Sequence, residues 1–242
     1  MIAYLGLEVR RTLRDAGFVI FGVGMPVAMY LLFSNLVLDG GGQRPEATVS
    51  LMVGMAAYGA LGSALSVGTG LAEDRSLGWL RQLRLTPLAP SRVVAARALT
   101  GSVIVLPTIV AVLLAGRLVN HVALAPWQWG ALLGLLWLGS APFTLLGLGN
   151  GYRLSAQTTG VVNLVCNLGL SVVGGLWVPT DSFPGWLRAL SGGTPTHRFA
   201  ELGWSVTDGH APHLATALAL AGWLALFAGY ALHAYRVCTR TA

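Results

Sequence analysis

Charged side chains gather in one short stretch of this chain, residues 73–97, which lies between long apolar segments. Glu73 and Asp74 open the stretch, and Arg81 and Arg84 follow a few turns later. An acidic start and a basic end stabilise a short helix through its dipole. Almost all other segments are apolar, so this stretch is where we expect a soluble partner to bind.

The helix predicted in this stretch has a moderately apolar face. Leu77, Leu80 and Leu83 share that face, and Arg84 interrupts it. Pro87 ends the helix, because proline lacks the N–H that would continue it. Such a helix, lying across the membrane surface, can dock into a groove of a soluble protein and move the spans that it joins. Composition alone equally allows a solvated loop that only sets topology.

Amides and histidines are the other candidate ligand-binding side chains. Gln157, Asn163 and Asn167 lie in an apolar segment, with the two asparagines one helical turn apart. Buried amides are costly unless they are paired or face a cavity, so they either bond between helices or line a route between subunits. His210 and His213 could share a face, but no third ligand accompanies them, and we predict no metal site.

Several classes of function lack the residues that they need. No Asp or Glu falls in the core of an apolar segment and no G-x-S-x-G occurs, which argues against an intramembrane enzyme and a proton-coupled transporter. No G-x-x-x-x-G-K-[ST] phosphate loop is present, so we expect no ATP hydrolysis by this chain alone. The basic balance comes entirely from arginine, which suits membrane topology better than binding to nucleic acid.

Composition requires these side chains to be positioned by membrane-spanning helices. The chain is 55% hydrophobic and 10% charged, too few charges to cover a water-facing surface. A spanning helix needs about 20 mostly apolar residues. The sequence therefore predicts one all-α transmembrane domain, residues 1–242, with six spans at about 17–38, 48–72, 92–118, 127–150, 156–178 and 214–236.

Arginine placement predicts the orientation. With the N-terminus inside, 11 arginines lie on the cytoplasmic side and 4 outside, so both termini are expected in the cytoplasm. Residues 2–14 form an amphipathic pattern typical of a helix in the headgroup plane. In the second span, small residues recur at four-residue spacing and allow close packing, within the subunit or at a subunit interface: Ala56, Ala60, Ala64 and Gly68.

Two motifs resemble those of a known family. Residues 73–88 read EDRSLGWLRQLRLTPL, similar to the family pattern E-R-E-x-G-T-L-E-x-L-x-x-T-P, although Arg81 stands where an acid is common. Residues 177–179 (WVP), 183–187 (FPGWL) and 190–191 (LS), with Pro195 and Glu201, match a segment between the last two spans. In both motifs, and in span count, the chain resembles ABC transporter permeases of the type-2 exporter class, the daunorubicin-resistance-like permeases that export drugs, lipids or polysaccharides.

The resemblance implies a fold and partners. It implies a cytoplasmic coupling helix within residues 73–90 and a re-entrant helical hairpin within residues 180–204. It also implies two ABC ATPase subunits that bind ATP and Mg²⁺, a second permease copy, identical or related, and a hydrophobic or amphipathic substrate moved outward across the plasma membrane. A non-transporting scaffold or sensor subunit is the alternative.

The site residues follow from the same resemblance. The ATPase-coupling residues are Glu73, Asp74, Arg75, Leu77, Leu80, Arg81, Leu83 and Arg84. Gln157, Asn163 and Asn167 are the predicted pathway residues, because the fifth span of this family usually lies near the dimer axis. No catalytic residue, no metal and no directly bound cofactor is expected in this chain.

Overall fold

A computed structural model describes residues 14–39, 45–76, 90–178 and 180–241 of the 242-residue chain. In chain order its helices are the π-helix η1 (Phe18–Gly24), α2 (Met25–Asp39), α3 (Pro45–Ser76), α5 (Pro90–Leu118), α6 (Pro126–Gly139), α7 (Ala141–Arg153), α8 (Ala156–Val173), the 3-10 helix η2 (Thr180–Ser182), α9 (Gly185–Gly193), α10 (Pro195–Thr207) and α11 (Leu214–Thr241). The predicted interfacial helix 2–14 and most of the coupling segment, 77–89, lie outside the described residues.

The predicted all-α class with six spans is confirmed for the described part of the chain. Six helical stretches there are long and apolar enough to cross a membrane, and every regular element there is a helix. The second span, α3, is the centre of the bundle, with 78% of its most apolar window buried, whereas the windows of the first and last spans are each 17% buried. Helices α2, α5, α7, α8 and α10 all pack against α3.

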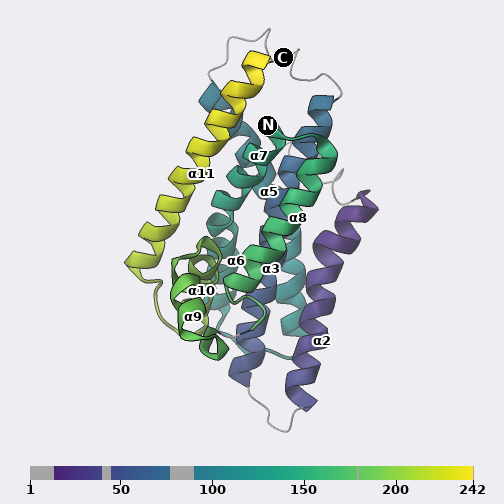
Figure 1. The fold of residues 1–242 in the computed structure, drawn as a ribbon. Helices are drawn as coiled ribbons and strands as arrows, with labels where there is room; N and C mark the ends of the chain where they lie inside the picture. The colour runs from purple at the N-terminus through teal and green to yellow at the C-terminus, as the bar shows by residue number, and fades with distance from the viewer. Residues whose placement is uncertain (1–13, 40–44, 77–89, 179, 242) are drawn as a thin grey trace.

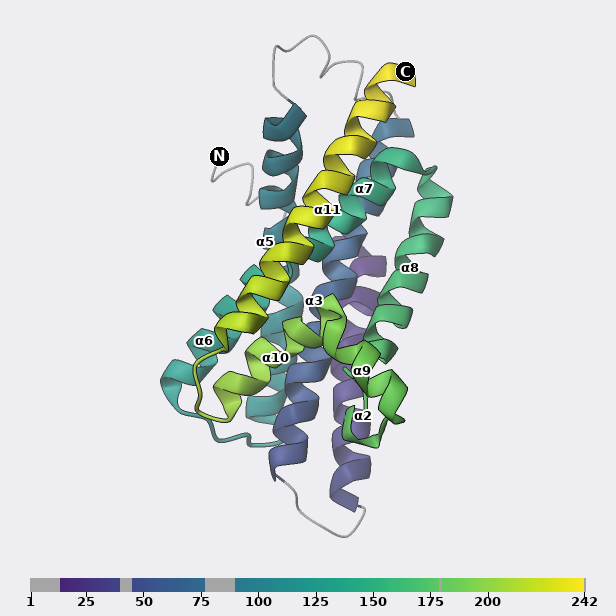
Figure 2. The same ribbon diagram turned by 60° about the vertical axis from the view of Figure 1, so that its left-hand side comes forward.

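Two ends of the bundle are easily distinguished (Figure 1). The upper end in Figures 1 and 2 holds the ends of α3, α7 and α11 and the starts of α5 and α8. The lower end holds the start of α3, the end of α5 and the two short helices α9 and α10. Helix α11 crosses one side of the bundle obliquely (Figure 2) and packs along α7.

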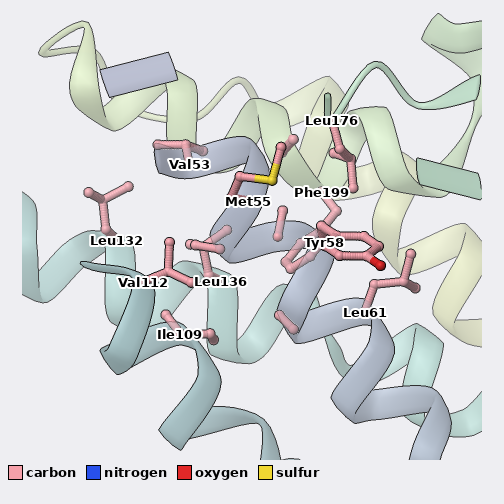
Figure 3. Packing of buried hydrophobic residues seen from close by; sticks show 14 of the residues in the cluster. Val53, Met55, Tyr58, Leu61, Ile109, Val112, Leu132, Leu136, Leu176 and Phe199 are labelled. Atoms are coloured by element: carbon pink, nitrogen blue, oxygen red, sulfur yellow. The ribbon is translucent and has the colours of Figure 1, made fainter. Parts of the chain in front are cut away.

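The core of the lower half is built around α3. Figure 3 shows Val53, Met55, Tyr58 and Leu61 of α3 in one cluster with buried residues of α5, α6 and α10. Phe199 of α10 is fully buried and its ring lies 5.4 Å from that of Phe143 at the start of α7. Helix α10 is therefore part of the bundle and does not lie loosely on its surface.

Glycine and proline set the helix boundaries within the spans. Helix α8 ends at Val173, five residues before the predicted end of the span, because Gly175 adopts φ +74°. The N–H of Gly175 then donates to the carbonyl of Val172 and that of Leu176 to Ser171, which is a Schellman motif. The fourth span is two helices, α6 and α7, which meet at Ser140.

The first span begins with the π-helix η1. The N–H of Met25 reaches back five residues to the carbonyl of Ile20. Pro26 follows directly and, because it has no N–H, leaves the carbonyl four residues before it without the usual helical donor. The widened turns end there, and α2 continues the span.

Candidate functional site

The charged residues predicted for ATPase coupling begin inside helix α3. Glu73, Asp74 and Arg75 occupy its last turn at the upper end, before Ser76 ends the helix. Glu73 is exposed, whereas Asp74 and Arg75 are half-buried. The remaining predicted coupling residues lie outside the described residues: Leu77, Leu80, Arg81, Leu83 and Arg84.

Asp74 and Arg75 both bond to other helices of the same subunit. The Arg97 guanidinium of α5 donates from Nη2 to Oδ2 of Asp74 at 3.1 Å. Arg75 donates from Nη1 to the carbonyls of Gly151 at 2.6 Å and Leu154 at 3.3 Å, at the end of α7. The structure thus brings α3, α5 and α7 together at the last described turn of α3, before residue 77.

Directly below these contacts, α3 and α7 touch through glycine. A Cβ atom on Gly68 would clash with the backbone of Gly147, and one on Gly151 would clash with the carbonyl of Gly68. Ala56, Ala60 and Ala64, the other members of the small-residue stripe, are fully buried within this subunit. The stripe therefore serves packing inside the subunit, the first of the two interpretations of this pattern.

Asn163 belongs to a buried hydrogen-bond network that joins four helices. Its Nδ2 donates to the carbonyl of Leu65 at 2.8 Å and to Oγ1 of Thr69 at 3.3 Å, both on α3. Its Oδ1 accepts from Nδ2 of Asn150 on α7 at 2.8 Å. The hydroxyl of Tyr230 on α11 completes the network by donating to Oδ1 of Asn150 at 2.9 Å. These bonds are the interhelical pairing that makes a buried amide tolerable.

The other two amides of α8 have different surroundings. Asn167 lies against Gly62 of α3, and its Oδ1 is buried with no hydrogen-bond partner among the described residues. Gln157, at the upper end of the helix, is exposed. Of the three predicted pathway residues, only Gln157 is exposed on the surface of this subunit. The pathway role stays a prediction for all three.

Sequence reasoning missed Asn150 and Tyr230, which support Asn163. The signal was present, because Asn150 is an amide within the glycine-rich run GLGNG, residues 147–151, of an otherwise apolar span. Glycines at 147, 149 and 151 allow close approach of α3 and of the Tyr230 ring. An amide in such a run is placed at a contact between helices.

The described residues contain no candidate metal site. No group of three His, Cys, Asp or Glu side chains there is close enough to hold an ion. His210 and His213, the pair with suggestive spacing, both lie in the connection between α10 and α11.

Six helices of the described part of the chain are long and apolar enough to span a membrane, which defines a multi-pass membrane protein. A family model described as ABC-2 type transporter matches residues 2–202, so the chain belongs to the ABC-2 type transporter family. It is also similar to the protein of Bacillus subtilis (strain 168) named "Putative transport permease YvfS", with 28% identity over 223 residues, 91% of this chain and 90% of that protein. The resemblance to this class of permease is thereby confirmed.

Proposed function

We propose that this chain is the transmembrane subunit of an ATP-driven exporter, which moves a hydrophobic or amphipathic substrate such as a drug, a lipid or a lipid-linked glycan outward. The observation that carries the proposal is the family match over residues 2–202, in a chain whose charged segment joins α3 to α5. Two separate ATPase subunits bind ATP and Mg²⁺ and dock on the segment 77–89. The upper end then faces the cytoplasm, together with both termini.

A second permease copy, identical or related, completes the pathway in this proposal. The support is the open face of α8, on which large apolar side chains are exposed: Val161, Leu164, Val165, Leu168 and Val172. Only 22% of this span is buried within the subunit. Gln157 continues the same face at its upper end, and there it would meet a substrate entering from the cytoplasmic leaflet.

Co-purification tests the proposal most directly. The chain is extracted from its native membrane in mild detergent, and every stoichiometric partner is identified. We expect an ATPase subunit with a phosphate loop, two copies per two permeases. Absence of any ATPase, under conditions that preserve a known complex of this type, would refute the exporter function and favour a scaffold or sensor subunit.

Two substitutions then test the docking segment. Leu80→Asp and Leu83→Asp place a charge on the predicted docking face and should reduce ATPase recovery at least about tenfold, since a buried unpaired charge costs several kcal/mol. His210→Asp is the matched control, because it adds the same carboxylate at an exposed position of the α10–α11 connection. Full ATPase recovery with both leucine variants would contradict this docking surface.

A further inference from the structure

We propose that Asp74 and Arg75 form a clamp within the permease, which passes movement of the segment 77–89 to α5 and α7 together, and that they do not contact the ATPase. The clamp is defined by two bonds, Asp74 to Arg97 and Arg75 to the end of α7. This inference rests on the proposed function, and it reassigns two residues that sequence reasoning placed in the ATPase contact.

The Asp74–Arg97 ion pair joins the upper ends of α3 and α5. Both side chains are mostly shielded, with 28% of Asp74 and 19% of Arg97 exposed. A shielded, hydrogen-bonded ion pair is stronger than one in open water, because water and salt screen it less. The same two helices are joined covalently through residues 77–89. The ion pair therefore holds the upper ends of α3 and α5 together, so that they move as a unit.

Arg75 connects the same turn of α3 to α7. The last carbonyls of a helix have no partner within it, and they lie at the negative end of the helix dipole. The guanidinium of Arg75 donates to two such carbonyls, those of Gly151 and Leu154. A cation placed there satisfies the exposed carbonyls and holds the end of α7 against α3.

The glycine contacts below Arg75 make this connection stiff. Gly68, Gly147 and Gly151 bring the backbones of α3 and α7 into direct contact, with no side chain between them that could change rotamer. Packed backbone transmits displacement because neither partner can yield locally. A shift of the end of α3 must therefore displace α7, and with it α11, which packs along α7.

Two adjacent residues of α3 thus bond to two different helices. Asp74 bonds to α5 and Arg75 to α7. Neither residue needs a partner outside the chain to satisfy the charges described here. Glu73, the third acidic or basic residue of this turn, is exposed and stays available to the ATPase.

Hydrogen–deuterium exchange of the permease in lipid nanodiscs tests the clamp. In Arg75→Gln, the amides of residues 150–154 should exchange at least about tenfold faster than in the wild-type chain, because two hydrogen bonds from a charged group are lost. Arg153→Gln is the matched control, because it removes an exposed arginine at the same end of α7. Unchanged exchange in Arg75→Gln would overturn the clamp.

A second measurement, on the complex with its ATPase, separates a coupling role from a merely structural one. Adding ATP and Mg²⁺ should alter exchange in α7 of the wild-type complex, and this response should be lost in Arg75→Gln while ATPase recovery stays normal. Asp74→Asn should lose the response in α5, and the reversed pair Asp74→Arg with Arg97→Asp should restore it.

The outcomes distinguish the clamp from the proposed function. A normal nucleotide response in Arg75→Gln, or loss of ATPase recovery in Asp74→Asn and Arg75→Gln, would refute the inference and return these residues to the ATPase contact. Failure of the wild-type chain to recover any ATPase would instead refute the proposed function. The first exchange measurement needs no ATPase and tests the Arg75 contact in either case.

Discussion

Replacing the two asparagines of α8 separately should have very different effects on stability. Asn163→Leu removes three hydrogen bonds, to the carbonyl of Leu65, to Thr69 and from Asn150. Hydrogen bonds between helices in a membrane average about 0.6 kcal/mol each, so their loss costs about 2 kcal/mol. The amide of Asn150 is then left with a donor unpaired, which costs about 1–3 kcal/mol more.

Asn167→Leu removes a side chain whose buried Oδ1 has no partner among the described residues. Replacing an amide whose buried oxygen is unpaired by an apolar group of similar size relieves a desolvation cost, so stability should stay within about 0.5 kcal/mol or rise. The two variants should therefore differ by about 3–5 kcal/mol in the free energy of unfolding, although they exchange the same residue types one helical turn apart.

Reversible unfolding in mixed micelles, with denaturing detergent added stepwise, measures this difference. Both variants carry the same new side chain on the same helix, so effects of leucine on helix propensity and insertion cancel in the comparison. Equal destabilisation by the two substitutions would refute the reasoning, because it would mean that the network around Asn163 contributes nothing specific. A loss of stability confined to Asn167→Leu would refute it as well.

Two further substitutions test other contacts of the bundle. Gly68→Val should strongly reduce the yield of folded protein, because even a Cβ at this position clashes with the backbone of Gly147. Gly70→Val, at an open position two residues later, should leave the folded peak on gel filtration unchanged. Gln128→Leu should destabilise the fold by about 2 kcal/mol and speed proteolysis between α10 and α11, since the buried Gln128 amide donates to the carbonyls of Val206 and Thr207. Gln157→Leu is the exposed counterpart, and an equal stability of the two variants would contradict this prediction.

The sequence predicts the number and order of the spans well because both depend on local composition. Length and hydropathy alone place six helices, and Thr194 and Pro195 mark the start of α10, where the Thr194 hydroxyl accepts from the N–H of His197. The early end of α8 depends on one glycine with positive φ, and hydropathy carries no sign of it, since residues 174–178 are as apolar as the helix before them.

The hydrogen-bond and ion-pair partners of the polar side chains could not be predicted from the sequence. Asp74 and Arg75 lie in a charged stretch that suggests an external partner, yet both bond inward, because α5 and α7 bring Arg97 and two helix-end carbonyls within reach. Asn163 and Asn167 look equivalent in sequence, yet among the described residues only Asn163 has hydrogen-bond partners for its amide. Such outcomes depend on which helix packs at which depth, and no local pattern records that.

Helices α7 and α8 pack against α3 in different ways, and the difference bears on movement. Helix α7 meets α3 through glycine backbone and the Arg75 contact, an interface with no space to slide. Helix α8 meets α3 through side chains, the hydrogen bonds of Asn163 to Leu65 and Thr69 and the amide of Asn167, which an added Cβ on Gly62 would approach to 3.0 Å. Side-chain contacts can change rotamer and re-form with other partners, whereas backbone contacts cannot. Under the proposed clamp, we therefore expect α7 to follow a displacement of the end of α3 more closely than α8 does, so that the spacing of α3 and α8 changes.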